Sequence, residues 1–166
     1  MTGYEAKVVA DRAALPARVE ALARPLVFTN GCFDLLHRGH VDYLHQARAL
    51  GASLLVALNT DASVARLGKG PGRPMVPLED RMAVIAALGC VDLVTCFDEP
   101  TPLELILAVR PDVLVKGGDW AADAVVGGRE VRTWGGVVRT IDVRFVRSTT
   151  ALAARIRALP GDDAGD

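Results

Sequence analysis

The chain has 166 residues, about the length of one domain, which is enough to bury a single hydrophobic core. Its formal net charge of -1 lacks the basic excess that nucleic-acid-binding proteins need, so we expect no nucleic-acid partner. No apolar run is long enough to span a bilayer, the first residues do not form a secretory signal, and the three cysteines follow no regular spacing. We therefore expect a cytoplasmic domain with no membrane partner.

Apolar runs and helix-forming stretches alternate along the chain, separated by glycine, proline or polar residues. The pattern predicts helices at residues 11–24, 40–50, 78–88, 102–110 and 149–159. It predicts strands at residues 26–29, 53–58, 91–97, 113–116 and 137–143. This alternation is typical of an α/β protein and predicts a single Rossmann-like domain, with a five-stranded parallel sheet and helices on both faces.

The sequence contains no internal repeat and no evident second domain. We expect the folded domain to cover residues 1–160 and the acidic segment at residues 161–166 to be a disordered tail. In parallel α/β sheets, ligands bind beyond the carboxyl ends of the strands, near the point where the strand order reverses. The polar and glycine-rich motifs of this chain follow predicted strands, as that rule requires.

The most informative motif follows the first predicted strand. Residues 29–40 have the sequence Thr-Asn-Gly-Cys-Phe-Asp-Leu-Leu-His-Arg-Gly-His and lead directly into a predicted helix. The start of a helix presents unpaired backbone N–H groups and the positive end of the helix dipole. His37 and His40 can donate hydrogen bonds to a phosphate there, and Gly39, which lacks a Cβ, lets a ligand approach the backbone closely. The motif therefore predicts a nucleotide phosphate site.

Two other interpretations of this motif explain less. Cys32, His37 and His40 carry donor atoms that bind zinc, but no further cluster of cysteine and histidine lies nearby in the sequence to complete a tetrahedral set. Ordinary surface histidines at a helix start would not account for the Asn-Gly-x-Phe-Asp sequence that precedes them. We expect no metal site formed by the protein alone.

The sequence Asn-Gly-Cys-Phe-Asp-Leu-Leu-His-x-Gly-His resembles the signature of the HIGH-type nucleotidyltransferase superfamily, in its cytidylyltransferase-like branch. In such enzymes a substrate phosphate attacks the α-phosphorus of a nucleoside triphosphate in line, while the protein positions the reactants and neutralises charge. The resemblance implies that His37 and His40 are catalytic. The nucleotide contacts that we expect from this segment are those of Asn30, Gly31, Cys32, Phe33 and Gly39.

Residues 66–77 are rich in glycine and proline and are predicted to form a loop. The loop carries two cations, Lys69 and Arg73, and follows the Asn-Thr-Asp motif after the second strand. We interpret it as a lid that brings Lys69, a third catalytic residue, and Arg73 onto the triphosphate; a solvated basic loop is the alternative. It is not a Walker A loop, because no Ser or Thr follows Lys69 at the required place. The dinucleotide-binding glycine pattern is also missing after the first strand.

Ser148, Thr149 and Thr150 open the last predicted helix. Hydroxyl side chains at a helix start cap its free N–H groups, and the same geometry presents hydroxyls and N–H groups to an anion. The superfamily that the chain resembles carries a Ser-Thr-Thr element in this position, where it binds the β- and γ-phosphates. We therefore expect both roles, with all three residues in nucleotide binding.

Three further segments narrow the resemblance. Val-Lys-Gly-Gly-Asp at residues 115–119 resembles the adenylyltransferase family of ADP-heptose synthesis, and so do residues 59–64 and 70–81. This resemblance implies transfer of AMP from ATP to a heptose 1-phosphate, with a magnesium ion on the triphosphate. We assign nucleotide binding to Lys116, Gly117 and Asp119 as well. The residues that we assign to acceptor binding are Asp34, Asn59, Asp61 and Arg81.

Two positions depart from the heptose family. Trp120 replaces a tyrosine, so that Gly-Asp-Trp resembles the glycerol-phosphate cytidylyltransferases equally, and Arg147 stands where a small residue is common. A cytidylyltransferase acting on glycerol 3-phosphate or a similar small alcohol phosphate is therefore the alternative. An inactive nucleotide-binding regulator has little need of both histidines, Lys69 and the Ser-Thr-Thr element together. The expected partners are ATP and a sugar phosphate, and the oligomeric state is open between a monomer and a homodimer.

Overall fold

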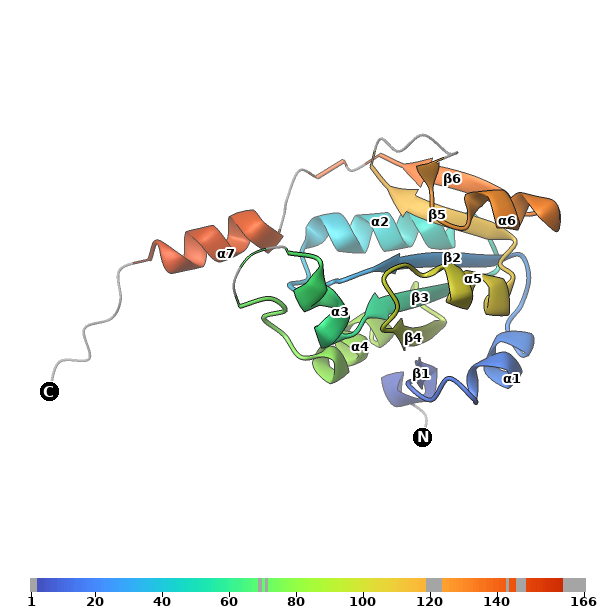
Figure 1. Ribbon diagram of the computed structural model, residues 1–166, viewed down its shortest axis with the longest axis horizontal. Coiled ribbons are helices and arrows are strands. Elements are labelled where there is room, and N and C mark those ends of the chain that lie inside the picture. Colours follow the sequence, from blue (N-terminus) through green and yellow to red (C-terminus); the bar gives the residue numbers. More distant parts are fainter. Residues whose placement is uncertain are drawn as a thin grey trace, which may run out of the picture.

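The computed structural model describes residues 3–68, 70, 72–118, 124–142, 144–145 and 149–159. Within these residues lies a six-stranded sheet in the order β1-β4-β3-β2-β5-β6, in which all neighbouring strands are parallel (Figure 1). The strands are β1 (Val8–Val9), β2 (Leu26–Gly31), β3 (Ser53–Asn59), β4 (Leu93–Phe97), β5 (Val113–Gly117) and β6 (Val137–Ile141). The helices are η1 (Tyr4–Lys7), α1 (Leu15–Glu20), α2 (Arg38–Arg48), α3 (Asp61–Arg66), α4 (Leu78–Ala86), α5 (Leu103–Val109), α6 (Gly128–Thr133) and α7 (Thr149–Arg157).

This architecture confirms the predicted α/β class and the Rossmann-like domain, with one correction: the sheet has six strands rather than five. The additional strand, β1, has two residues, which pair with Val94 and Thr95 of β4 at the edge of the sheet. Two residues are too few to show the apolar run of about 4–8 residues by which a buried strand is recognised. The short helices η1, α3 and α6 are not predicted by the sequence pattern either.

Among the predicted helices, the first shows the largest difference. α1 spans Leu15–Glu20 instead of residues 11–24, because the residues before it form turns in which the Asp11 carboxylate accepts a hydrogen bond from the Ala13 N–H at 2.9 Å. β6 ends at Ile141, and residue 143 lies outside the described residues. The limits of the domain and the acidic tail at residues 161–166 stay predictions, because residues 160–166 also lie outside them.

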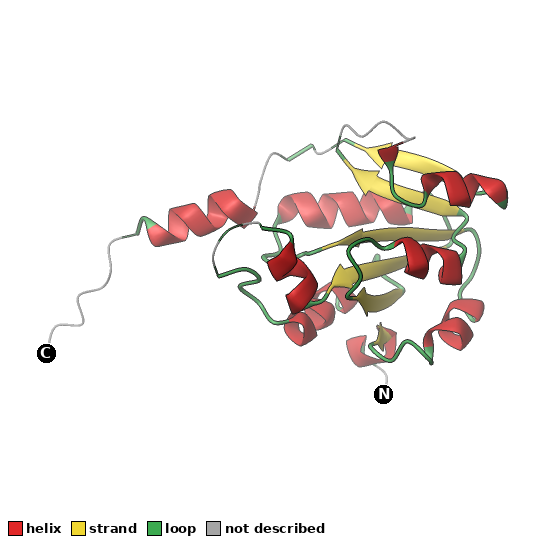
Figure 2. Ribbon diagram, in the orientation of Figure 1, coloured by secondary structure: helices red, strands yellow, loops and turns green. Residues whose placement is uncertain are grey.

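Helices cover both faces of the sheet (Figure 2). α1, α5 and α6 pack on one face in a core cluster that includes Phe28 and Leu55, and α2 and α4 pack on the other in a cluster that includes Val27 and Leu54. Successive residues of β2 and β3 therefore belong to opposite clusters, and all of β3 is buried. Burial of each such apolar side chain contributes about 1.5–3 kcal/mol. The central strands are thus a well-packed support for the segments that follow them.

The strand order reverses at β2, in the centre of the sheet. From β2 the chain continues through β3 and β4 on one side, and then crosses to β5 and β6 on the other. The carboxyl ends of β2, β3 and β5 therefore lie next to one another, and ligands of parallel α/β sheets bind at such a point. α7 projects away from the sheet in Figure 1. None of the helices in the described part of the chain combines the length and the apolar character needed to cross a bilayer.

Candidate active site

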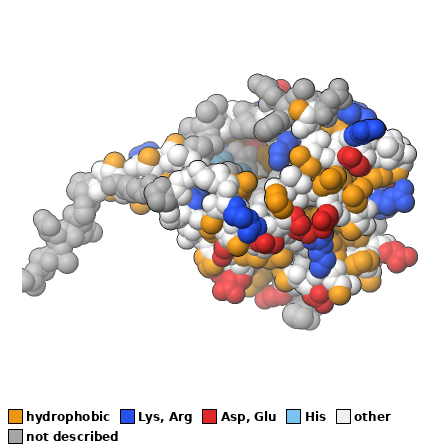
Figure 3. Space-filling view, in the orientation of Figure 1, with side chains coloured by type: hydrophobic (Ala, Val, Ile, Leu, Met, Phe, Trp, Pro, Cys, Tyr) orange, Lys and Arg blue, Asp and Glu red, His pale blue; other side chains and the backbone are white. Residues whose placement is uncertain are grey.

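A cavity of about 570 Å³ opens at the carboxyl ends of β2 and β5, where the strand order favours a ligand. Its walls are the segment after β2, the first turn of α2, the end of β5 and the start of α7. The predicted catalytic and nucleotide-binding residues that line it are Asn30, Gly31, Cys32, Phe33, His37, Gly39, His40, Lys116, Gly117, Thr149 and Thr150. In Figure 3, pale-blue histidine atoms lie in a recess of the surface near Lys and Arg side chains.

His37 and His40 stack against each other at the start of α2. Their ring centroids are 3.8 Å apart, with an interplanar angle of 16°. Phe33, at a positive φ of 45°, forms an edge contact with His40 at a centroid distance of 5.2 Å. Burial lowers the pKa of His37 below its ordinary value. We therefore expect the His37 ring to be neutral at neutral pH, with one N–H donor.

Two helix N-termini converge on this cavity. His37 is the N-cap of α2, and its side chain accepts no capping hydrogen bond from the first turn of that helix. Thr149, the first residue of α7, donates its hydroxyl to the Leu35 carbonyl at 3.4 Å, which fixes the helix start against the segment after β2. Helix N-termini carry partial positive charge and free N–H groups. The cavity therefore suits a polyanion.

Gly39 keeps these groups close together. A Cβ at this position would lie 3.1 Å from Cε1 and Nδ1 of His37, and also 3.1 Å from the carbonyl oxygen of Phe145. Any side chain here would displace either the His37 ring or the backbone that carries Phe145. Gly39 thus has a steric role inside the protein in addition to the close ligand approach that the sequence predicts.

Tyr43 also lines the cavity, although it was not predicted as a site residue. Its hydroxyl lies 2.6 Å from the Thr29 hydroxyl and donates to the Val115 carbonyl at 3.3 Å, which ties α2 to β2 and β5. Burial raises the pKa of Tyr43 to about 12, so the hydroxyl stays protonated. The signal for Tyr43 was its spacing, because it follows His40 by three residues on the same face of the helix.

A second cavity, of about 260 Å³, lies beside the first, at the ends of β2, β3 and β4. The residues that line both cavities are Asn30, Gly31, Cys32 and Lys116. Ligands in the two cavities would therefore lie side by side, with Lys116 next to both.

The smaller cavity combines polar and apolar walls. Asn59, predicted as an acceptor-binding residue, lines it together with Thr101, Phe97 and Val125. Asn59 is held in place by a hydrogen bond from its Nδ2 to Oγ of Ser63 at 3.0 Å. Thr101 was not predicted as a site residue, although it follows the third predicted strand and the preference for carboxyl ends applies there as well.

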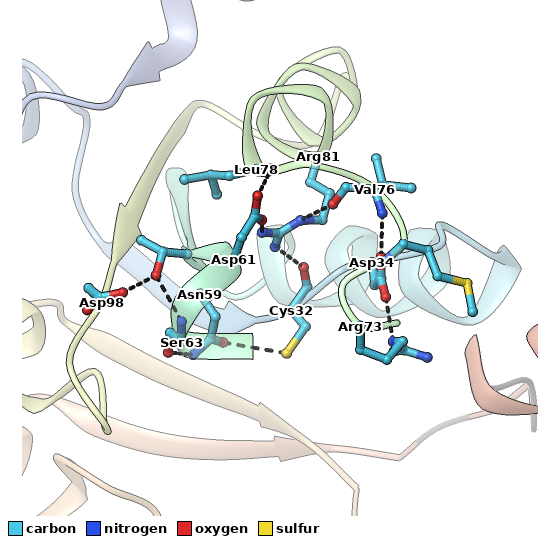
Figure 4. Close-up of polar contacts among 12 residues, drawn as sticks. Cys32, Asp34, Asn59, Asp61, Ser63, Arg73, Val76, Leu78, Arg81 and Asp98 are labelled. Atoms are coloured by element: carbon cyan, nitrogen blue, oxygen red, sulfur yellow. Dashed lines mark hydrogen bonds and ion pairs between the residues drawn. The ribbon is translucent and has the colours of Figure 1, made fainter. Parts of the chain in front are cut away.

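Arg81 and Asp61, also assigned to acceptor binding from the sequence, lie outside both cavities. The Arg81 side chain is 0% exposed and donates to Asp61 Oδ1 at 2.6 Å, to the Cys32 carbonyl at 2.7 Å and to the Val76 carbonyl at 2.9 Å (Figure 4). Its donors are thus directed at the protein. We propose that Arg81 is a positioning residue that ties the end of β2 to the loop before α4; the acceptor role of Asp61, whose side chain is 47% exposed, stays a prediction.

Asp34 lines the larger cavity, but its carboxylate contacts the protein itself. Oδ1 accepts hydrogen bonds from the backbone N–H groups of Met75 and Val76 at 2.8 and 3.0 Å. Oδ2 forms an ion pair with Nε of Arg73 at 2.5 Å. These contacts connect the motif after β2 with the end of the glycine-rich loop, and they differ from the acceptor contact that was expected of Asp34.

Three predicted site residues, Lys69, Asp119 and Ser148, lie outside the residues that the structure describes, as do Trp120 and Arg147. Their roles stay predictions. In the described part of the chain, no group of three or more His, Cys, Asp or Glu side chains is arranged to hold a metal ion.

Comparisons with known proteins agree with this geometry. A family model described as cytidylyltransferase-like matches residues 28–155. The chain is 57% identical over 156 residues to D-beta-D-heptose 1-phosphate adenylyltransferase from Bordetella bronchiseptica, covering 93% of this chain and 96% of that protein. It is 56% identical over 142 residues to the bifunctional protein HldE from Magnetococcus marinus, covering 86% of this chain and 29% of that protein.

Among solved structures, the lipopolysaccharide core biosynthesis protein from Thermoplasma volcanium GSS1 is similar to this chain. The two share 28% sequence identity with a TM-score of 0.59, covering 71% of this chain and 94% of the other. The likeness therefore extends over almost the whole of the smaller protein.

Proposed function

The chain belongs to the cytidylyltransferase-like family, and on that premise we propose that it transfers AMP from ATP to a heptose 1-phosphate. An oxygen of the sugar phosphate attacks the α-phosphorus, the bond from the α-phosphorus to the bridging oxygen breaks, and ADP-heptose and pyrophosphate form. Negative charge develops on the departing pyrophosphate, so the enzyme needs positioned donors rather than a nucleophile of its own. The relative named as a heptose 1-phosphate adenylyltransferase, at 57% identity, supports this choice of substrates.

One observation carries the proposal: two stacked imidazoles and two helix N-termini surround a single cavity at the strand switch. His37 and His40 donate hydrogen bonds to the α-phosphate and to the oxygen that leaves with pyrophosphate. The N-termini of α2 and α7 neutralise the remaining phosphate charge, and the hydroxyl of Thr150 adds a donor, whereas that of Thr149 donates to the Leu35 carbonyl. The nucleotide is therefore held with its α-phosphate beside the histidines.

The smaller cavity suits the sugar of the acceptor. Asn59 and Thr101 offer polar groups for sugar hydroxyls, and Lys116, which lines both cavities, lies where the attacking phosphate and the α-phosphate would meet. A choline-like cation would instead require a cage of several aromatic rings. Phe97 is the single aromatic residue among the described lining residues of this cavity. A phosphate ester rich in hydroxyls is thus the better fit.

A magnesium ion carried by the triphosphate fits the donor set of this site. Mg²⁺ retains several waters and binds largely through substrate phosphates, so it does not need a cage of protein ligands. When bound, it would neutralise charge on the β- and γ-phosphates. We further propose that Lys69, Asp119 and Ser148 contribute to nucleotide binding as the sequence motifs indicate, and that the enzyme works in the cytoplasm, where ATP is supplied.

Pyrophosphate release tests this function directly. Each of the four nucleoside triphosphates is paired with heptose 1-phosphate or with glycerol 3-phosphate, and the sugar nucleotide is identified by chromatography. We expect ATP with heptose 1-phosphate to be preferred by a wide margin, because a mismatched base leaves buried polar groups unpaired. Turnover of CTP with glycerol 3-phosphate, and none of ATP with the heptose phosphate, would establish the alternative. Nucleotide binding without any turnover would make the chain a regulator.

A further inference from the structure

The ion pair between Asp34 and Arg73 is buried in the wall of the larger cavity. Nε of Arg73 lies 2.5 Å from Oδ2 of Asp34, and the two side chains are only 7% and 0% exposed. Moving two charges out of water is costly, so a buried pair adds little to stability by itself. Both residues line the cavity that also holds the stacked histidines and the two helix N-termini. Their position indicates a role toward a ligand.

Asp34 determines where the end of the glycine-rich loop lies. Its Oδ1 accepts hydrogen bonds from the N–H groups of Met75 and Val76, while Oδ2 faces Arg73. Arg81 holds the same segment from the other side through the Val76 carbonyl at 2.9 Å. In Figure 4, Asp34 lies between the backbone of Val76 and the side chain of Arg73. Arg73 is therefore oriented by contacts that do not involve a substrate.

A guanidinium in this orientation can bind phosphate. Nε of Arg73 lies 2.5 Å from Oδ2 of Asp34 as an ion pair, although neither atom has a hydrogen-bond partner, and the remaining donors of the planar fork lie on its two Nη atoms. Such a fork matches the oxygens of a phosphate group. A lone carboxylate beside a triphosphate would repel it, whereas a carboxylate paired with Arg73 and with two backbone N–H groups does not. Because Arg73 offsets its charge, Asp34 can lie in the wall of an anion-binding cavity without repelling the anion.

We propose that Arg73 is a phosphate-binding residue of this cavity, and that Asp34 is a positioning residue that presets it rather than a ligand of the acceptor. The inference rests on the proposed function, which supplies two phosphate sources: the triphosphate and the phosphate of the sugar. Asp34 holds Arg73 at the wall of the cavity by a contact within the protein.

The test uses Arg73→Gln and Asp34→Asn. Asparagine keeps an oxygen that accepts from Met75 and Val76, but it removes the charge that holds Arg73. Arg24→Gln is the matched control, because Arg24 forms an exposed ion pair with Asp112 at 2.8 Å, next to the amino end of β2. Calorimetry measures the affinity for pyrophosphate with magnesium, and steady-state kinetics give kcat and the KM for ATP and for heptose 1-phosphate.

For Arg73→Gln we expect one KM to rise about ten- to a hundredfold, the range for a hydrogen bond to a charged group, with a smaller change in kcat. A higher KM for ATP together with weaker pyrophosphate binding assigns Arg73 to the triphosphate. A higher KM for heptose 1-phosphate with unchanged pyrophosphate binding assigns it to the acceptor phosphate. Asp34→Asn should raise the same KM. The double variant should lose less binding free energy than the sum of the losses in the two single variants.

Chemical rescue separates ligand binding from a structural role. Free guanidinium ion, added at millimolar concentration to Arg73→Ala, should restore part of the lost affinity. If both variants bind all three ligands within about twofold of wild type and only their thermal stability falls, the pair is structural and the inference is wrong. Should Asp34→Asn fail to fold, the two Arg73 variants decide the question. Pyrophosphate binding requires no transfer, so wild-type protein that binds pyrophosphate without turnover would refute the proposed function and leave this inference standing.

Discussion

Replacement of His40 with alanine perturbs the proposed chemistry most directly. The imidazole lines the phosphate cavity, with its centroid 3.8 Å from that of His37. Loss of one donor to transition-state charge costs about 2.7–4 kcal/mol, a factor of about 10²–10³ in kcat. The stack adds a second effect, because without His40 the His37 ring loses part of the burial that lowers its pKa and is less well ordered. We therefore expect a loss toward the upper end of that range.

The assay separates turnover from binding. Pyrophosphate release at saturating substrate gives kcat, and calorimetry with ATP in the absence of acceptor gives the ground-state affinity, which should change much less. His40→Gln keeps an N–H donor at the same position and should retain more activity than His40→Ala. His45→Ala is the matched control, because His45 lies on the same helix, is exposed and does not line either cavity.

Two outcomes would refute this reasoning. A kcat for His40→Ala within about threefold of wild type would show that the imidazole does not act on the transition state. Equal losses of ATP affinity and of kcat/KM would show that His40 binds the nucleotide uniformly and contributes nothing specific to the chemical step.

Three further predictions concern stability and steric fit. The pKa of His37 lies below its ordinary 6.5 because of burial, so the unfolded chain binds a proton first as the pH falls. The free energy of unfolding from urea titrations should therefore decrease below about pH 6.5, and His37→Asn should flatten that slope; an unchanged slope would contradict it. Arg81→Met leaves the carbonyls of Cys32 and Val76 unpaired and should lower the free energy of unfolding by about 3–5 kcal/mol. Arg24→Met, at an exposed position, should lower the free energy of unfolding by less than about 1 kcal/mol. Equal losses in Arg24→Met and Arg81→Met would mean that Arg81 is not a positioning residue. In Gly39→Ala the added Cβ would lie 3.1 Å from the His37 ring and from the Phe145 carbonyl oxygen, so these neighbours must shift by a few tenths of an ångström. We expect kcat to fall by about tenfold, less than the roughly hundredfold loss that a misplacement of about 1 Å causes, and wild-type kcat would show that the ring moves without penalty.

Most of the sheet could be predicted because its central strands have long apolar runs. β3 is Ser53–Asn59, against a prediction of residues 53–58, since its residues are buried on both faces and apolar throughout the middle. β1 and the short helices depend instead on tertiary contacts. Val8 is a strand residue because Val94 lies beside it, and nothing in the neighbouring sequence records that pairing.

The site residues likewise divide into those whose role could be predicted from the local sequence and those whose contacts appear only in the folded chain. Residues that follow a strand or open a helix, such as Asn30, His37 and Thr149, were predicted from position, and the structure brings them to one cavity. The contacts that Asp34 and Arg81 make within the protein could not be predicted by this route. A carboxylate that binds a ligand has the same sequence signature as one that binds backbone. The contacts of Asp34 with Met75 and Val76 span 41 and 42 residues, and only the folded chain shows them.

The attraction of this site for a triphosphate has to come from the local arrangement of its groups, because the net charge of the chain does not supply it. A chain with a formal net charge of -1 has no general attraction for a triphosphate, and the His37 ring is expected to be neutral. The attraction must come from groups fixed in orientation: the N-termini of α2 and α7, Lys116 between the two cavities, and Arg73 held by Asp34. Buried and partly buried charges are screened by salt much less than exposed ones. Nucleotide binding at this site should accordingly depend on the integrity of the contacts that orient these groups more than on ionic strength, which is why a positioning residue such as Asp34 can matter as much as a residue that touches phosphate.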